Sequence, residues 1–280
     1  MIDFTGVLSI TIPEGKVVKI TNAAGDILWQ KPAGEDYKEL YQRVDYLYTK
    51  GGTSGGWFLT DFIPNNTSGM ELTFAVPSFS DVATMGTRTS ASNTRCYIFY
   101  PRTTSVGYIG WNTAQSWTIT TAANTKYITR MNWLASKKAV LLKEDGSSIG
   151  SKSMSGTLAT QVAPISICRY NNYTNTPSGG RAMYLYGARF TQGSEIVREY
   201  IPCYRKSDGI MGLYETFTNT FVESQVADGF TKGEDIEWEE PVANVASTFS
   251  LRNNLRPVDE EDDGYTEPWY ENIDLGGYGE

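Results

Sequence analysis

The chain has 280 residues, of which 40% are hydrophobic and 20% are charged, and its formal net charge is −8. It contains no histidine, which excludes Ser-His-Asp and Cys-His catalysis and most zinc sites. Many Thr, Ser, Tyr, Gly and Asn residues favour a fold of short strands joined by tight turns.

Residues 1–34 predict a small β-hairpin element. Two apolar runs, Val17–Ile20 and Ile27–Trp29, flank a turn in which Asn22 and Gly25 tolerate positive φ. A lone hairpin is only marginally stable in water. We therefore expect this element to rest on the main domain or on another chain.

The first residues, "MIDFTGVLSI", lack the basic region and the long apolar run of a signal peptide. No stretch reaches the roughly 18 apolar residues that a membrane-spanning helix needs. We therefore expect neither secretion nor membrane insertion.

Residues 35–232 predict the main body, an all-β sandwich or jelly roll. Hairpin turns are indicated at Asp145–Gly146, Gln192–Gly193 and Asp208–Gly209, each between strand-like runs. Pro202 follows an alternating run and predicts the end or the edge of a strand. The run "DYKELYQRVDYLY" at 36–48 fits either a short helix or an irregular segment.

Residues 233–280 form an acidic extension with 14 acidic and 2 basic side chains, whereas residues 1–232 contain 18 and 22. This composition is typical of disorder, yet the extension is rich in large apolar residues. Such a segment suits docking on a basic groove of a partner, and the near-neutral body offers no basic face for nucleic acid. The predicted docking residues, one of them in the hairpin, are Trp29, Trp238, Phe249, Leu251, Leu255, Trp269 and Tyr270.

The three cysteines, Cys96, Cys168 and Cys203, form no CxxC pair and have apolar or aromatic neighbours. This spacing does not support a metal knuckle or a redox motif. We expect small core residues, and a disulfide between two of them stays open.

Three runs carry a resemblance to a known family. "ELYQRVDYL" and "GGWFLTDFIPNN" are followed far downstream by "YLYGARFTQGSEIVREYIPCYRKSDGIMGLYETFTNTFV". Together they resemble the concanavalin A-like lectin/glucanase fold in its laminin-G-like branch, in the version of tailed-phage virion proteins and gut-bacterial surface proteins. The match is nearly complete over residues 184–221 and covers about residues 37–230. The resemblance implies a two-sheet antiparallel jelly-roll sandwich, in which Arg205 to Asp208 belong to a turn.

The hairpin run "GKVVKITNAAGDILW" also resembles short elements attached to phage structural proteins. We therefore expect a virion protein, made in the bacterial host cytoplasm and oligomeric within the particle. As a capsid decoration, head fibre or tail adhesin, it would contact capsid, portal-vertex or tail proteins and present a lectin-like domain to host or mucosal glycans. Two alternatives are a stand-alone carbohydrate-binding surface or prophage lectin of a gut bacterium, and a glycoside hydrolase.

Carboxylate motifs give hydrolysis and metal binding little support. Some glucanases of this fold use the strand motif E-x-D-x-x-E, which places acid and nucleophile on one face, but "EDIEWEE" has Ile236 at the Asp position. The acidic run 259–263 resembles a calcium loop, yet Tyr270 replaces the glutamate that such a loop needs. We expect no catalytic residue, no cofactor and no metal site.

Glycan recognition requires aromatic faces beside amide and hydroxyl groups. Each tryptophan in a loop-like setting is more often part of a core than of a ligand platform. The predicted glycan-binding residues are Trp57, Trp111, Asn112, Trp117, Asn172 and Tyr173.

Overall fold

The computed structural model describes the backbone of residues 7–11, 19–22 and 27–30, and then residues 37–89, 95–172 and 177–238. The chain divides into two units, residues 1–236 and 237–280. Only Glu237 and Trp238 of the second unit are described. The fold described below is therefore that of the first unit.

The N-terminal element is a three-stranded antiparallel meander in the order β1-β2-β3. Strands β2 (Lys19–Asn22) and β3 (Ile27–Gln30) form the predicted hairpin, with Ile20 opposite Trp29. Strand β1 (Val7–Thr11) pairs with β2 and adds a third strand that the sequence pattern had not indicated.

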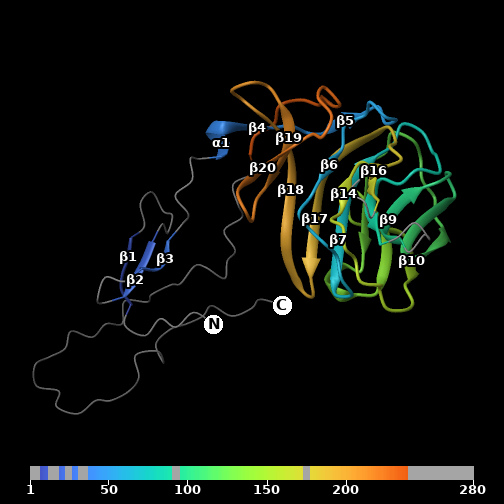
Figure 1. Cartoon of the computed structure of the whole chain (residues 1–280), viewed down its shortest axis with the longest axis horizontal. Helices are drawn as coiled ribbons and strands as arrows, with labels where there is room; N and C mark the ends of the chain where they lie inside the picture. The colour runs from blue at the N-terminus through green and yellow to red at the C-terminus, as the bar shows by residue number, and fades with distance from the viewer. Residues whose placement is uncertain are drawn as a thin grey trace, which may run out of the picture. The chain divides into compact units, whose positions relative to one another are not determined.

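The main body is a jelly-roll sandwich of two sheets (Figure 1). Its larger sheet has the order β13-β12-β11-β7-β17-β18-β19-β20, with β4, β5 and β21 joined beside β17 and β18. All of its pairs are antiparallel, as predicted. The strands are β4 (Tyr41–Arg43), β5 (Leu47–Thr49), β7 (Ser68–Ala75), β11 (Tyr127–Met131), β12 (Lys138–Lys143), β13 (Ser148–Ser153), β17 (Met183–Gln192), β18 (Glu195–Arg205), β19 (Met211–Glu215), β20 (Thr220–Glu223) and β21 (Thr231–Lys232).

The smaller sheet has the order β10-β9-β8-β14-β6, with β15 and β16 attached through β8. Its pairs are antiparallel except for the short parallel pair of β8 and β15. Helical structure in the described residues is limited to α1 (Tyr37–Leu40) and the 3-10 turn η2 (Trp133–Ala135). The strands are β6 (Phe58–Leu59), β8 (Met85–Arg88), β9 (Arg95–Pro101), β10 (Val106–Thr118), β14 (Ser166–Ile167), β15 (Tyr170–Asn171) and β16 (Pro177–Ser178).

The core lies between the two sheets and follows the two-residue period of the strands. In β7, Met70, Leu72 and Phe74 are at most 1% exposed, and they share one hydrophobic cluster with Phe58 and Ile109 of the smaller sheet. Each such side chain contributes about 1.5–3 kcal/mol of transfer free energy on burial. The intervening residues of β7 face away from the core, onto what we call the outer face of the larger sheet.

The predicted turns are confirmed at their glycines. Gly146, Gly193 and Gly209 have φ of 81°, 62° and 74°, which suits a residue without a side chain. Asp208 accepts a hydrogen bond from the Ile210 N–H at 3.1 Å, and the Gly209 N–H donates to the Arg205 carbonyl at 2.8 Å. Arg205, the last residue of β18, therefore begins the predicted turn, which continues through Asp208.

Two boundaries differ from the sequence-based expectation. Strand β18 continues through Pro202, whose carbonyl accepts a hydrogen bond from the Val44 N–H at 3.1 Å. Residues 233–236 also belong to the sandwich, because Gly233 N–H donates to Tyr46 and Ile236 N–H donates to Arg43. The body therefore extends four residues beyond the predicted end at residue 232.

All three cysteines are buried free thiols, as expected for small core residues. Burial raises the pKa of Cys203 to about 12, and it raises the pKa of Cys96 and Cys168 well above the usual range. The disulfide left open by the sequence is not formed.

Candidate functional site

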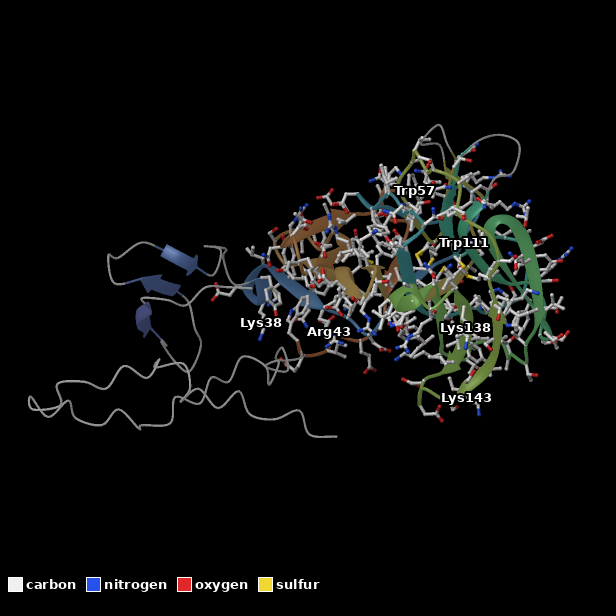
Figure 2. The ribbon with its side chains drawn as sticks, turned by 90° about the horizontal axis from the view of Figure 1, so that it is seen from below. Lys38, Arg43, Trp57, Trp111, Lys138 and Lys143 are labelled. Carbon is white, nitrogen blue, oxygen red and sulfur yellow. The ribbon has the colours of Figure 1, made fainter. Side chains whose placement is uncertain are left out.

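The three predicted glycan-binding tryptophans lie in the hydrophobic core. Trp57, Trp111 and Trp117 are 8%, 4% and 8% exposed and belong to the main cluster, and Figure 2 shows the first two among the strands of the sandwich. The Trp111 indole N–H also donates to the Gly156 carbonyl at 3.1 Å. Because a sugar ring stacks on an exposed aromatic face, this burial argues against these indoles as glycan platforms.

Of the remaining predicted glycan residues, the structure describes Asn112 and Asn172. Asn112, with φ 61°, donates to the Thr157 carbonyl and accepts from the Ala159 N–H at 2.7 Å. Its amide thus fastens the segment after β13 to strand β10. Asn172 is half-buried, and Tyr173 lies outside the described residues.

The predicted docking residues fall mostly outside the described residues. Trp29 stands in β3 opposite Ile20, and Trp238 is half-buried at the end of the described chain. Their docking role stays a prediction, as it does for Phe249, Leu251, Leu255, Trp269 and Tyr270, which lie beyond residue 238.

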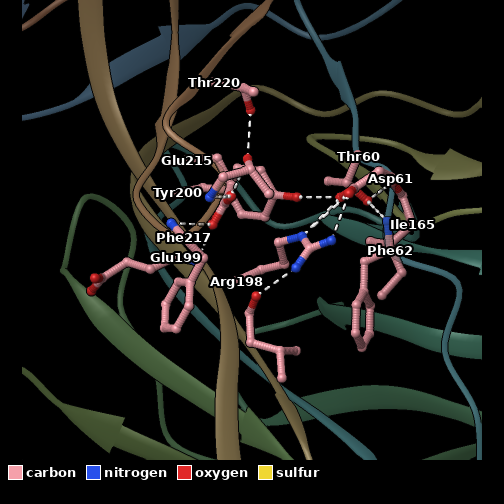
Figure 3. A network of polar contacts seen from close by, with 12 residues as sticks. Thr60, Asp61, Phe62, Ile165, Arg198, Glu199, Tyr200, Glu215, Phe217 and Thr220 are labelled. Carbon is pink, nitrogen blue, oxygen red and sulfur yellow. Dashed lines mark hydrogen bonds and ion pairs between the residues drawn. The ribbon is translucent and has the colours of Figure 1, made fainter. Parts of the chain in front are cut away.

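A polar network joins the two motifs that carry the family resemblance (Figure 3). Arg198 binds Asp61 with hydrogen bonds of 2.7, 3.1 and 3.3 Å, and the Tyr200 hydroxyl donates to the same carboxylate at 3.2 Å. Both the hydrogen bonds and the positive charge of Arg198 lower the pKa of Asp61. Asp61 comes from "DFIPN" and Arg198 from "VREYIP", so the two motifs are direct structural partners.

Glu215, at the end of β19, closes the turn into β20. Its 1% exposed carboxylate accepts from the N–H groups of Glu199, Phe217 and Thr218 and from the Thr218 hydroxyl. Both oxygens are therefore saturated by donors that hold the turn. This arrangement suits a structural cap rather than a general acid or a nucleophile.

A different cluster, on the outer face of the larger sheet, has the features of a binding site. Glu71 in β7 lies directly opposite Arg130 in β11 on one side and Arg189 in β17 on the other. Arg130 Nε donates to Glu71 Oε2 at 2.6 Å, and Arg189 Nη2 donates to Oε1 at 2.6 Å. The three side chains thus form a line across three adjacent strands.

Trp133 of η2 lies over this line. The guanidinium carbons of Arg130 and Arg189 are each 5.4 Å from the indole centroid, within the range of a cation–π interaction. Trp133 is only half-buried, so part of the indole faces solvent. We call Glu71, Arg130, Trp133 and Arg189 the Trp133 surface.

The loop after β11 is built to hold Trp133 over the sheet. Asn132, 1% exposed with φ 47°, donates to the Ser68 carbonyl at 2.9 Å and accepts from the Lys137 N–H at 2.9 Å. The loop can approach this closely because Gly69 has no side chain: a Cβ there would lie 2.4 Å from the Asn132 carbonyl oxygen.

The same loop holds strained backbone. Leu134, Ala135 and Lys137 have φ of 51°, 59° and 52°, a left-handed conformation that is costly for residues with a Cβ. Backbone strain of this kind clusters at functional sites. The strained backbone therefore also favours a functional role for the Trp133 surface.

Tyrosines extend the outer face along β17. Tyr184 packs against Tyr46 and Tyr48 with ring centroids 5.0 and 4.7 Å apart, and the Lys126 ammonium lies 4.5 Å from the Tyr186 ring centroid. Burial, with the nearby Asp45 charge, raises the pKa of Tyr186 to about 12. Tyr186 stands three positions before Arg189 in β17, about 10 Å along the strand, so Tyr186 lies near the Trp133 surface.

None of the four residues of the Trp133 surface was predicted from the sequence. A weak signal was present, since Glu71 and Arg130 each stand between apolar or Thr neighbours in strand-like runs. Alternation places such charges on the face opposite the core. It does not show that three strands bring them into one line.

Other kinds of site have little basis in the described residues. Within 37–89, 95–172 and 177–238 there is no group of three or more acidic or cysteine side chains arranged to hold a metal ion. None of the helices in the described part of the chain has the length and hydropathy of a membrane-spanning helix.

Two of the solved structures that resemble this chain are the following. A heptameric SAP-like pentraxin from Limulus polyphemus matches with a TM-score of 0.42 and 8% identity, over 55% of this chain and 78% of the pentraxin. A proposed carbohydrate-binding protein from Bacteroides ovatus matches with a TM-score of 0.40 and 10% identity, over 70% of this chain and 61% of that protein. No family model matches the chain. No curated protein matches it either.

Proposed function

We propose that this chain is a non-enzymatic adhesion protein whose jelly-roll sandwich binds glycans through the Trp133 surface. The observation that carries the proposal is a half-exposed indole held over two guanidinium groups that keep unused N–H donors. Aromatic faces beside fixed polar groups are what sugar recognition requires. The strained loop and the nearby Tyr186 add contact surface.

The absence of histidine and the saturated carboxylate of Glu215 support a role without catalysis. Asp61 likewise is held by Arg198 and Tyr200 as part of the scaffold. Turnover of a β-glucan by the purified chain would overturn this part of the proposal.

The binding test compares two solvent-accessible aromatic residues in connections of the larger sheet, Trp133 after β11 and Phe217 between β19 and β20. We expect the full chain to bind members of a glycan array, and Trp133→Ala to weaken that binding at least tenfold. Phe217→Ala serves as the matched control and should bind like the parent chain. Phe217 lies in the β19–β20 turn and is 52% exposed. Equal binding by Trp133→Ala would move the site elsewhere, and binding to no glycan would reject the function.

We further propose that the chain is a component of a tailed-phage particle, with the hairpin element and the acidic extension as its attachments. Support comes from the sequence resemblance over residues 184–221 and from the charge contrast between the body and residues 233–280. Salt screens the attraction between an acidic segment and a basic groove. We therefore expect the chain to dissociate from particles as the salt concentration rises.

The particle test uses a truncation after Trp238, which keeps the sandwich-forming residues 233–236. We expect labelled parent chain in purified particles and far fewer copies of the truncated chain. Unchanged incorporation would reject the docking role. Absence of the parent chain from particles, together with glycan binding, would instead favour a stand-alone lectin.

A further inference from the structure

The guanidinium groups of the Trp133 surface keep donors that no other described residue uses. Arg130 uses Nε on Glu71, which leaves both of its terminal nitrogens without a hydrogen-bond partner among the described residues. Arg189 uses Nε and Nη2 on Glu71 Oε1, which leaves its Nη1. The side chains are 35% and 34% exposed, so a ligand in solvent can reach them.

The charges of the cluster do not balance. Two guanidinium groups share the single carboxylate of Glu71, whose side chain is 6% exposed. The cluster therefore carries one net positive charge on a partly buried surface, where a fixed charge acts more strongly than in bulk water. A ligand with one negative charge would neutralise the cluster.

The donors and the indole together favour one class of anion. A guanidinium binds planar carboxylates, and also phosphates, through paired N–H groups. The indole beside it offers an apolar face for a sugar ring, so a sugar that carries its own carboxylate fits both features. A polyanion such as a nucleic acid or a heavily sulfated chain fits poorly, since the near-neutral body, with 18 acidic and 22 basic side chains in residues 1–232, offers no extended basic face.

We infer that the Trp133 surface takes a glycan with a carboxylate-bearing sugar, such as a sialic or uronic acid. The inference rests on the proposed glycan-binding function and names its ligand class. The carboxylate binds the open N–H groups of Arg130 and Arg189, and the sugar ring packs on Trp133.

Isothermal titration calorimetry measures the affinity of the full chain for sialyllactose, a glucuronate disaccharide and lactose. We expect an acidic sugar to bind at least tenfold more tightly than lactose, with the difference shrinking in 0.5 M salt. Arg130→Gln should remove most of that preference, so that the acidic sugar and lactose bind the variant with affinities within about threefold of each other. Lys138→Gln, an exposed cation at the start of the neighbouring strand β12, is the control.

A second measurement changes the ligand rather than the protein, in case Arg130→Gln fails to fold. Sialyllactose methyl ester keeps the ring and loses the charge, so we expect it to bind like lactose. Equal affinity for the acid, its ester and lactose would overturn the inference and leave glycan binding standing. Binding of a sulfated sugar equal to that of the carboxylate sugar would also overturn it. Failure to bind any of them would reject the proposed function itself for these sugars.

Discussion

Arg198 binds the carboxylate of Asp61, although 137 positions of sequence separate the two residues. Asp61 follows β6 of the smaller sheet, and Arg198 belongs to β18 of the larger one. The contact therefore ties the two sheets together. It explains why a short polar motif near residue 61 accompanies a strand motif near residue 200 in the same chain.

Replacing Asp61 with Asn should lower the free energy of unfolding at pH 7 by about 1 kcal/mol, because charge-assisted bonds to Arg198 are lost from a carboxylate that is 59% exposed. The pKa of Asp61 is lowered in the folded state. Its contribution is therefore present above about pH 4 and disappears as the pH falls below that.

Urea unfolding at pH 7 and pH 3 checks this, with Asp81→Asn as the control. Asp81 contacts Arg102 at 3.2 Å, and both side chains are exposed. Loss of this ion pair in Asp81→Asn should change the free energy of unfolding by less than about 0.5 kcal/mol. An Asp61→Asn effect that persists undiminished at pH 3 would contradict the linkage.

Glu215→Gln should destabilise the chain by about 2–3 kcal/mol. Each oxygen of Glu215 accepts from two donors, and a glutamine presents its NH₂ group to one of these pairs, which leaves buried donors unsatisfied. Thermal and urea unfolding measure the loss. Glu195→Gln, at an exposed position at the start of β18, should stay within about 0.5 kcal/mol, and a similar loss there would argue against the turn-capping role.

Gly69→Ala should displace the loop that holds Trp133. Its Cβ would lie 2.4 Å from both the Asn132 carbonyl oxygen and the Thr191 hydroxyl, so the loop must shift at a cost of about 1–3 kcal/mol. Hydrogen exchange should become faster in residues 132–138. Gly150→Ala is the control, because the Cβ at this position would lie 3.4 Å from its nearest neighbour. Unchanged hydrogen exchange in Gly69→Ala would show that the loop does not depend on the close approach at Gly69.

Arg181→Met should cost about 2–3 kcal/mol. The 3% exposed guanidinium donates to the carbonyls of Ser78 at 2.8 Å, Pro101 at 3.1 Å and Val82 at 3.2 Å, and methionine leaves these acceptors without their donors. Urea unfolding should show a much smaller loss for Arg102→Met, whose side chain is 44% exposed. Equal losses would mean that the buried carbonyls find other partners.

Stability should be nearly constant between about pH 5 and pH 8, since the chain has no histidine to titrate there. Above about pH 8.5 it should fall. The folded-state pKa of Cys203 is raised to about 12, so this thiol supports the fold below its unfolded pKa of about 8.5 and ceases to do so as the pH rises.

Cys203→Ala should reduce the fall between pH 8 and pH 10 by about 2 kcal/mol, the linkage value for one buried thiol over that interval. Urea unfolding across the pH range gives the profile. A parent chain that keeps its full stability at pH 10 would be inconsistent with three buried thiols.

Local chemistry made the fold predictable. The two-residue alternation and the turns at Gly146, Gly193 and Gly209 depend on neighbouring residues only, and the same holds for the buried character of the cysteines. Alternation and turns predicted an all-β sandwich or jelly roll, and the family resemblance implied the two-sheet antiparallel jelly roll that the structure shows. A strand pattern does not state which face meets the other sheet, however. The sequence therefore left Trp57, Trp111 and Trp117 open between a glycan platform and the core, and the structure places them in the core.

The Trp133 surface was decided by tertiary structure alone. Glu71, Arg130 and Arg189 come from three strands, and only the register of β7 with β11 and β17 aligns them. Trp133 reaches them because the loop crosses the sheet where Gly69 leaves room. Register and close approach arise from packing between residues far apart in the chain, and such packing leaves no periodic signal in the sequence.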